Sequence, residues 1–173
     1  MPASGRPSNS MPTSISTRQP RSKDSSAPVS VPAGPDSWPY VLDKQVGFIL
    51  RQAMQRHISI FSERIGNELT PRQFAALARL YQGGPLSQNR LGRYTAMDVA
   101  TIKGVVDRLT QRGFTKVQPD PGDGRLLVVQ LTSKGREVVE SAIPRAFEIS
   151  EETLSPLTKK ERTTFMRLLR KLC

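Results

Sequence analysis

Hydrophobic residues recur every three or four positions in the stretch that begins near residue 41 and ends near Ile65. The residues that share one helical face there are Val46, Ile49, Ala53, His57 and Ile60. This spacing matches a helix of 3.6 residues per turn with one apolar side. It predicts a long amphipathic helix that ends before the pair Gly66-Asn67.

Capping signals predict three shorter helices after it. Thr70-Pro71-Arg72-Gln73 offers an N-cap threonine, a proline at the first helical position and a glutamine at the third. That helix ends before Gly83-Gly84-Pro85. Ser87 caps a helix to about Tyr94, and Asp98 caps another to about Gly113. The expected buried stripe of this last helix comprises Ile102, Val105, Val106 and Leu109.

A hairpin and two more helices complete the pattern. Residues 114–118 and 126–131 are rich in strand-forming side chains, and the Pro-, Asp- and Gly-rich stretch 119–124 between them predicts a turn. Thr132 caps a long amphipathic helix to about Leu154, with a bend expected at Pro144. Thr158 and Glu161 form a capping box for a final helix.

The expected order of elements is four helices, two strands and two helices, with no internal repeat. This is a mainly α protein with a small β-hairpin. Two short helices separated by one turn and followed by a hairpin are typical of a helix-turn-helix with a wing. The long helices at both ends would form an outer layer around it. The fold class is therefore a winged helix-turn-helix with long N- and C-terminal helices.

Composition divides the chain and indicates a partner. Residues 1–36 are rich in Ser and Pro and poor in large apolar side chains, which predicts a disordered tail. The chain carries 26 Lys and Arg against 15 Asp and Glu, a net charge of +11, of which the tail supplies only +2. A folded part that basic favours a polyanionic partner, nucleic acid first and an anionic membrane surface second.

Several other classes are disfavoured. No apolar run approaches the roughly 18 residues of a membrane span, and no secretory signal is present, so we expect a soluble cytoplasmic protein. The only cysteine, Cys173, ends the chain and His57 is the only histidine, so neither a metal site nor any other cofactor is expected. No nucleotide-binding, hydrolase or metalloprotease motif occurs. An enzyme is not expected.

Six fragments, taken in order and spacing between Val46 and Gly135, resemble the MarR family of bacterial regulators. The fragments are Val46-Gly47-Phe48-Ile49-Leu50-Arg51, Leu69-Thr70-Pro71-Arg72-Gln73-Phe74, Leu86-Ser87-Gln88, Val105-Val106-Asp107-Arg108-Leu109 through Arg112-Gly113-Phe114, Asp120-Pro121-Gly122-Asp123-Gly124-Arg125, and Leu131-Thr132-Ser133-Lys134-Gly135. Within this family the chain is similar to repressors of aromatic-acid or nicotinate catabolism.

The resemblance implies a single unit over residues 37–173 that forms an obligate two-fold homodimer. Residues 37–66 and 132–173 would supply interleaved dimerisation helices, and residues 70–131 the winged DNA-binding lobe. The family also implies a palindromic operator, and small aromatic acids that release the DNA. Gly124, Val99 and Gly104 depart from the common pattern, where a basic residue and longer polar side chains are frequent, so the operator sequence cannot be transferred from relatives.

Candidate DNA-binding residues fall on three elements. Off the buried stripe of the helix at 98–112 lie Val99, Ala100, Thr101, Lys103 and Arg108, available to a major groove. At the start of the preceding helix lie Ser87, Gln88, Asn89 and Arg90, suited to phosphates. Arg125 at the hairpin tip fits a narrow minor groove, with Asp123 holding its orientation. The alternatives are a solvated helix face, a simple N-cap at Ser87 and an ordinary turn.

Candidate effector-binding residues lie mainly on the first helix. Arg51 suits a carboxylate and His57 a ring hydroxyl or nitrogen. The aromatic side chains expected near them are Phe48, Phe61, Phe74 and Tyr81. The alternative for both Arg51 and His57 is an ordinary core or interface role. Together these residues would wall an apolar pocket with a few polar groups, the usual form of a small-molecule site.

Two functions remain open at this point. The first is a sequence-specific transcriptional regulator, expected to be a repressor that a hydroxylated benzoate or nicotinate releases from its operator. The second is an architectural protein that binds DNA without sequence preference and without a ligand.

Overall fold

In the computed structural model, five of the helices begin at a side chain that accepts a hydrogen bond from a free backbone N–H group three residues ahead. The capping residues are Thr70, Ser87, Asp98, Thr132 and Thr158. At Thr70 and Thr158 the third helical residue, Gln73 or Glu161, also accepts from the backbone of the cap, so both capping boxes are complete. Local sequence therefore sets where these helices start.

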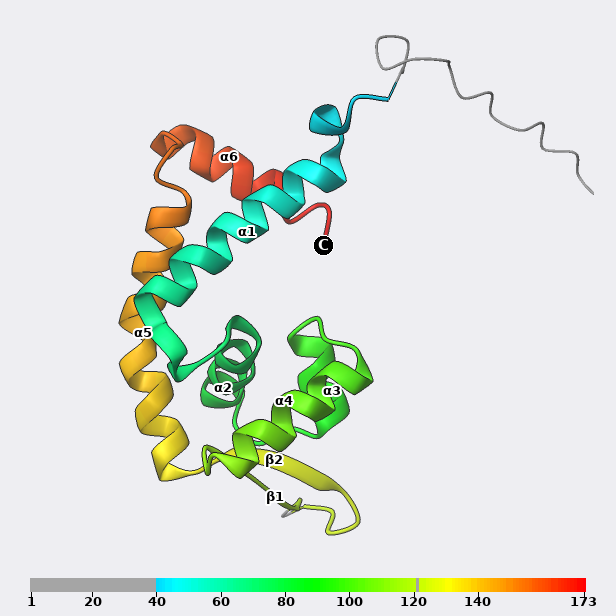
Figure 1. The fold of residues 1–173 in the computed structure, drawn as a ribbon. Coiled ribbons are helices and arrows are strands. Elements are labelled where there is room, and N and C mark those ends of the chain that lie inside the picture. Colours follow the sequence, from blue (N-terminus) through cyan, green and yellow to red (C-terminus); the bar gives the residue numbers. More distant parts are fainter. Residues whose placement is uncertain (1–39, 121) are drawn as a thin grey trace, which may run out of the picture. The chain divides into compact units, whose positions relative to one another are not determined.

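The structure describes residues 40–120 and 122–173, so the expectation for the tail at 1–36 lies outside it. In order, the main elements are α1 (Val46–Ile65), α2 (Pro71–Gly83), α3 (Gln88–Tyr94), α4 (Val99–Gln111), β1 (Thr115–Pro119), β2 (Leu127–Leu131), α5 (Ser133–Thr153) and α6 (Lys159–Leu169). Two 3₁₀ turns, Leu42–Lys44 and Gly66–Glu68, flank α1. The predicted mainly α chain with one hairpin is confirmed (Figure 1).

Both strands start one residue later than predicted, for a local reason. The N–H of Phe114 donates to the carbonyl of Leu109, which closes the end of α4 after Gly113 has turned the chain with a φ of 73°. Glycine adopts this left-handed conformation without steric cost. On the other strand, the N–H of Leu126 donates to the carbonyl of Asp123 and so belongs to the turn.

The hairpin is tied to the helices at its base. β1 and β2 pair antiparallel in a register that places Thr115 opposite Leu131 and Pro119 opposite Leu127. Val129 of β2 also exchanges two backbone hydrogen bonds with Leu86, the residue before the N-cap of α3. The wing base is therefore positioned by the same segment that starts the helix-turn-helix.

One apolar core joins the winged lobe to α5. Its largest fully buried side chains come from α2, α3, α4, β2 and α5, and include Leu77, Leu91, Ile102, Leu109, Val129 and Ile149. The predicted buried stripe of α4 is confirmed, because all four of its side chains are at most 2% exposed. α5 continues through Pro144 as one helix.

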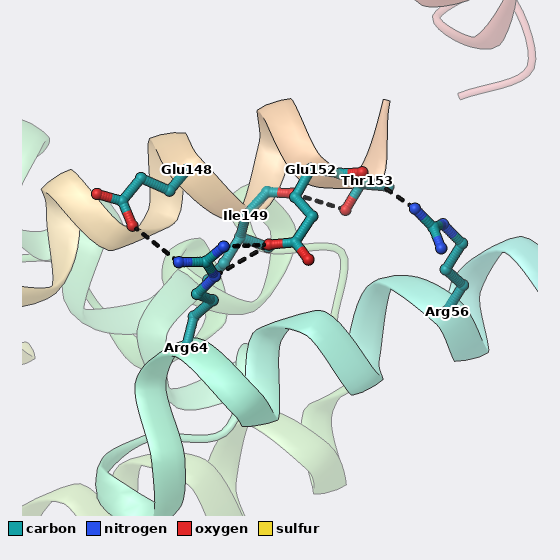
Figure 2. Close-up of polar contacts among 6 residues, drawn as sticks. All are labelled: Arg56, Arg64, Glu148, Ile149, Glu152 and Thr153. Carbon is teal, nitrogen blue, oxygen red and sulfur yellow. Dashed lines mark hydrogen bonds and ion pairs between the residues drawn. The ribbon is translucent and has the colours of Figure 1, made fainter. Parts of the chain in front are cut away.

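A polar seam joins the second half of α1 to the end of α5. Figure 2 shows Arg64 between Glu148 and Glu152, with hydrogen bonds of 2.9 and 2.7 Å to one carboxylate oxygen of Glu152. The hydrogen bonds that Arg64 donates to Glu152, followed by the charge of that carboxylate, raise the pKa of Arg64. Arg56 donates to the backbone carbonyl of Glu152 at 3.2 Å. These contacts link the second half of α1 to the end of α5.

The first half of α1 differs from the sequence expectation. Val46 and Ile49, on the predicted apolar face, are 67% and 50% exposed, and the buried residues of the helix are Ile60, Phe61 and Ile65 near its end. The amphipathic pattern is present, but in a single chain most side chains of its N-terminal half remain exposed.

Candidate DNA-binding surface and effector pocket

The face of α4 opposite its buried stripe is open to solvent. Val99 is 68% exposed, and Ala100, Lys103 and Arg108 are also exposed. Thr101 is half-buried. Its N–H donates to the Asp98 carboxylate at 2.7 Å and its hydroxyl donates to the same carboxylate at 2.8 Å. These two bonds lower the pKa of Asp98. Four of the five predicted side chains are thus exposed, while Thr101 binds the capping carboxylate, and contact of all five with DNA stays a prediction.

Two further features of α4 escaped the sequence analysis. The Lys103 ammonium lies 2.7 Å from the Asp107 carboxylate, so the charge of Lys103 is partly neutralised. The guanidinium of Arg108 lies along the helix above Gly104, 3.5 Å from where a Cβ would stand. The i,i+4 spacing of Lys103 and Asp107 was the signal that could have revealed the pair.

The start of α3 matches its expected geometry. The hydroxyl of Ser87 accepts from the N–H of Arg90 at 3.4 Å, Gln88 is half-buried, and Asn89 and Arg90 are exposed. Ser87 is therefore an N-cap, and its contact with a phosphate stays a prediction. The side chain of Arg90 donates to the hydroxyl of Tyr94, one turn further along the helix, at 3.3 Å.

The wing tip is organised by two aspartates. Asp120 accepts from the N–H groups of Gly122 and Asp123 at 2.7 and 3.2 Å. Asp123 accepts from the backbone N–H and the side-chain Nε of Arg125 at 3.1 and 3.2 Å. The Arg125 side chain is 92% exposed. The expected orientation of Arg125 by Asp123 is thus present, while the rest of the guanidinium remains accessible.

A pocket of about 320 Å³ lies between α1, α5 and α6. It is lined by Leu50, Ala53, Met54, His57, Ser150, Thr153, Leu154, Phe165, Met166 and Leu169. Apart from the histidine and two hydroxyl side chains, this lining is apolar. Such a wall suits a small ligand with few polar atoms.

Hydrogen bonding sets the tautomer of His57 in this pocket. The Thr153 hydroxyl donates its single proton to the carbonyl of Ile149 at 2.7 Å. Its oxygen lies 2.9 Å from Nδ1 of His57, so Nδ1 must be the donor. In the neutral ring, Nε2 then carries a free lone pair. His57 therefore offers an oriented acceptor among lining residues that, apart from Ser150 and Thr153, are apolar.

The other predicted effector residues are not among the residues that line this pocket. Arg51 is exposed, with its guanidinium 5.3 Å from the ring centre of Phe48. Arg51 and His57 are six residues apart, so at 100° per residue their side chains leave α1 about 120° apart around the helix.

The two aromatic residues from α2 face the core instead. Phe74 packs edge-to-face on buried Phe61 at 6.0 Å, and Tyr81 lies under Arg136 of α5 at 5.2 Å. Of the five predicted effector residues, the single chain therefore places only His57 in the pocket.

None of the helices in the described part of the chain is both long and apolar enough to cross a membrane.

Comparison with known proteins identifies the class of protein. Residues 69–127, which span α2 to the start of β2, match the model of the MarR family. The HTH-type transcriptional repressor NicR of Pseudomonas putida is 43% identical over 138 residues, which cover 79% of this chain and 87% of the relative.

Two solved structures are also similar. A probable transcriptional regulator from Pseudomonas aeruginosa shares 52% identity with a TM-score of 0.73, over 77% of this chain and 100% of that one. BpsR of Bordetella bronchiseptica shares 41% identity with a TM-score of 0.74, over 78% and 96% of the two chains. That structure is described as showing how 6-hydroxynicotinic acid regulates DNA binding by BpsR.

These relatives are transcriptional regulators and not enzymes, in agreement with the sequence analysis. The predicted winged helix fold is confirmed, and so is the likeness to nicotinate regulators. The chain belongs to the MarR family of winged helix-turn-helix transcriptional regulators.

Proposed function

We propose that this chain is a dimeric repressor that binds a palindromic operator and leaves it when a hydroxylated nicotinate or a related small aromatic acid binds. The observation that carries the DNA-binding part is the exposed face of α4 beside the wing. Val99, Ala100, Lys103 and Arg108 face solvent there, and the side chain of Arg125 is exposed at the wing tip. A helix and an arginine so exposed suit a major groove and the adjacent minor groove.

The open apolar residues on α1 and α6 support a dimer. Exposed side chains on these helices include Val46, Ile49, Met54, Phe165 and Leu168. Large exposed apolar patches mark interaction sites. A second copy that covers them would form a two-fold dimer with two recognition helices, and such a dimer fits a palindromic operator with half-sites about one helical turn apart.

The effector proposal rests on the pocket beside His57 and on the likeness to BpsR. Nε2 of His57 can accept from a hydroxyl or ring N–H, and the apolar wall can cover an aromatic ring. The carboxylate would pair with Arg51, brought to the ligand by the dimer arrangement together with the neighbouring Phe48. Release then requires the ligand to prefer the dimer shape that does not fit the operator.

Selection of bound duplexes from a random-sequence pool tests the DNA part. We expect one palindromic sequence to be enriched, and a footprint limited to it. Binding should weaken with salt, with a slope of at least about −5 for the dimer in log K against log salt. Even coverage of DNA without an enriched sequence would favour the architectural alternative.

Calorimetric titration of 6-hydroxynicotinate into the wild type, Arg51→Ala and His57→Ala tests the effector part, with release of the selected operator followed in parallel. We expect both variants to lose most of the binding and the release. If both respond as the wild type does, the effector residues are assigned wrongly, although DNA binding can stand.

A further inference from the structure

The exposed side of α3 extends past the residues predicted to contact phosphates. At 100° per residue, Asn89, Arg93, Arg90 and Tyr94 follow one another around one side of the helix. Leu91 lies fully buried on the other side. The polar arc therefore runs the whole length of α3.

Two arginines from different helices converge on Tyr94. The guanidinium of Arg79, from α2, lies 5.4 Å from the centre of the tyrosine ring and that of Arg90 lies 5.8 Å from it. Arg79 also donates to the backbone carbonyl of Tyr94 at 3.3 Å. The ring itself is 49% exposed. Tyr94 thus acts as a platform that holds two cationic side chains in place.

The charge of this cluster is not neutralised locally. Within residues 40–120 and 122–173, no carboxylate lies within ion-pairing distance of Arg79, Arg90 or Arg93. Converging guanidinium groups repel one another, so their arrangement favours an anion between or beside them.

The tyrosine hydroxyl adds a directional donor. Its oxygen accepts from Arg90 at 3.3 Å, which leaves its own proton free to donate outward. The hydrogen bond and the charge of Arg90 also lower the pKa of Tyr94, which makes the O–H group a stronger donor to an anionic oxygen.

The cluster adjoins the recognition helix. A hollow of about 300 Å³ lies between α3 and the start of α4, with Asn89 and Arg93 on one wall and Asp98 and Val99 on the other. Arg93 is therefore a neighbour of the helix end expected to enter the major groove. DNA that reaches Val99 passes close to Arg93.

We propose that Arg79, Arg90, Arg93 and Tyr94 form a second backbone-contact surface, which binds phosphodiester groups of the DNA strand beside the groove that α4 enters. This inference rests on the proposed DNA binding and extends it to Arg79, Arg93 and Tyr94. Contacts to phosphates fix the position of a protein on DNA but carry no sequence information. The surface therefore adds affinity for operator and random DNA alike.

The test uses the full chain, a random-sequence duplex of about three helical turns and an operator obtained by selection. Affinity is measured against salt for the wild type, the double variant Arg79→Gln/Arg93→Gln, and Tyr94→Phe. Each lost phosphate contact removes about 0.9 from the salt slope, so the double variant should lose about 3.6 per dimer on both DNAs. Tyr94→Phe keeps the aromatic platform and should weaken both affinities about threefold or more.

Arg170→Gln/Lys171→Gln, the loss of two positive charges at exposed positions outside the winged lobe, is the matched control and should keep the wild-type slope. Thermal unfolding followed by circular dichroism confirms that the variants are folded. Wild-type slopes in the folded double variant would overturn the inference while leaving operator binding intact. A wild type that shows no salt-dependent DNA binding would instead overturn the proposed function.

Phosphate-ethylation interference locates the contacts. With the wild type, ethylation of backbone phosphates next to the half-site groove should block binding, and some of these positions should become insensitive in the double variant. An identical interference pattern for both proteins would also overturn the inference.

Discussion

Asp98 links the stability of α4 to its presentation to DNA. Its carboxylate accepts from both the N–H and the hydroxyl of Thr101, at the end of the helix where unpaired N–H groups gather. The same bonds lower its pKa from an ordinary value of 3.8. A carboxyl group with a depressed folded pKa stabilises the fold above its unfolded pKa, and this contribution is lost as the pH falls through the folded pKa.

We therefore predict that Asp98→Asn, which keeps a good N-cap without a titrating group, flattens the acid limb of the stability curve. Thermal midpoints measured from pH 7 down to about pH 3 should fall less for Asp98→Asn than for the wild type. Asp98→Ala should lower the midpoint already at pH 7, because the cap itself is lost. Parallel curves for the wild type and Asp98→Asn would contradict the role of the carboxylate.

At the wing tip, Arg125 pairs with Asp123 although its side chain is 92% exposed. We predict that Arg125→Ala weakens binding most where the operator flanks are rich in A·T pairs, since a narrow minor groove has the strongest negative potential. Competition between duplexes that differ only in their flanks measures the difference. Arg108→Ala, on the recognition helix, should instead change the preferred bases, at about 1–3 kcal/mol for a good direct contact. An equal loss on all flanks for Arg125→Ala would mean that it contacts phosphates only.

At the scale of elements, the junction between the wing and α5 brings the backbone closer to a glycine than at any other described glycine. A Cβ on Gly135 would meet the carbonyl group of Phe114, closer than atoms can approach. Thr132 binds the same segment, because its N–H donates to Phe114 and its hydroxyl to Gly113. The start of α5 therefore lies directly on the chain that leaves α4.

We predict that Gly135→Ala lowers the free energy of unfolding by about 2 kcal/mol or more, since the backbone on both sides must move. Gly47→Ala is the matched control, because nothing lies within 4 Å of a Cβ at that position in α1. It should be neutral or stabilising by up to about 1 kcal/mol, the usual gain from replacing a helical glycine. Urea titration of both variants checks this, and equal stabilities would show that the close approach is relieved at little cost.

At the scale of the whole molecule, the open apolar residues of α6 predict the oligomeric state. Leu168→Lys would place a charge in the surface proposed to be covered by a second copy. We expect the dimer dissociation constant to rise by at least about tenfold, or 1.4 kcal/mol. Sedimentation at several protein concentrations measures it. Thr163→Lys, at an exposed position about 140° from Leu168 around α6, should leave the dimer intact. A wild-type dimer for Leu168→Lys would place the interface elsewhere.

The sequence predicted much of the fold. The N-caps at Thr70, Asp98 and Thr158 act within three residues, so sequence alone determines where those helices begin. The buried stripe of α4 and the turn before Arg125 are equally local, and with the ordered family fragments they identified the winged helix-turn-helix. The left-handed conformation of Ala96 in the turn after α3, with a φ of 52°, was not predictable. It accompanies a hydrogen bond from the N–H of Met97 to the carbonyl of Gly92.

The candidate sites depended more on tertiary structure. Residue types and helical positions predicted the exposed face of α4, because a periodic pattern fixes which side of a helix is buried. Only the packing of α1 against α5 and α6 decided that His57 meets Thr153 in a pocket. Only the contact between α1 and α2 decided that Phe74 packs on Phe61. Likewise, Arg79 reaches Tyr94 because α2 and α3 pack together, although 15 residues separate them in the chain. Local signals act within one element, whereas contacts between elements depend on how their apolar faces pack.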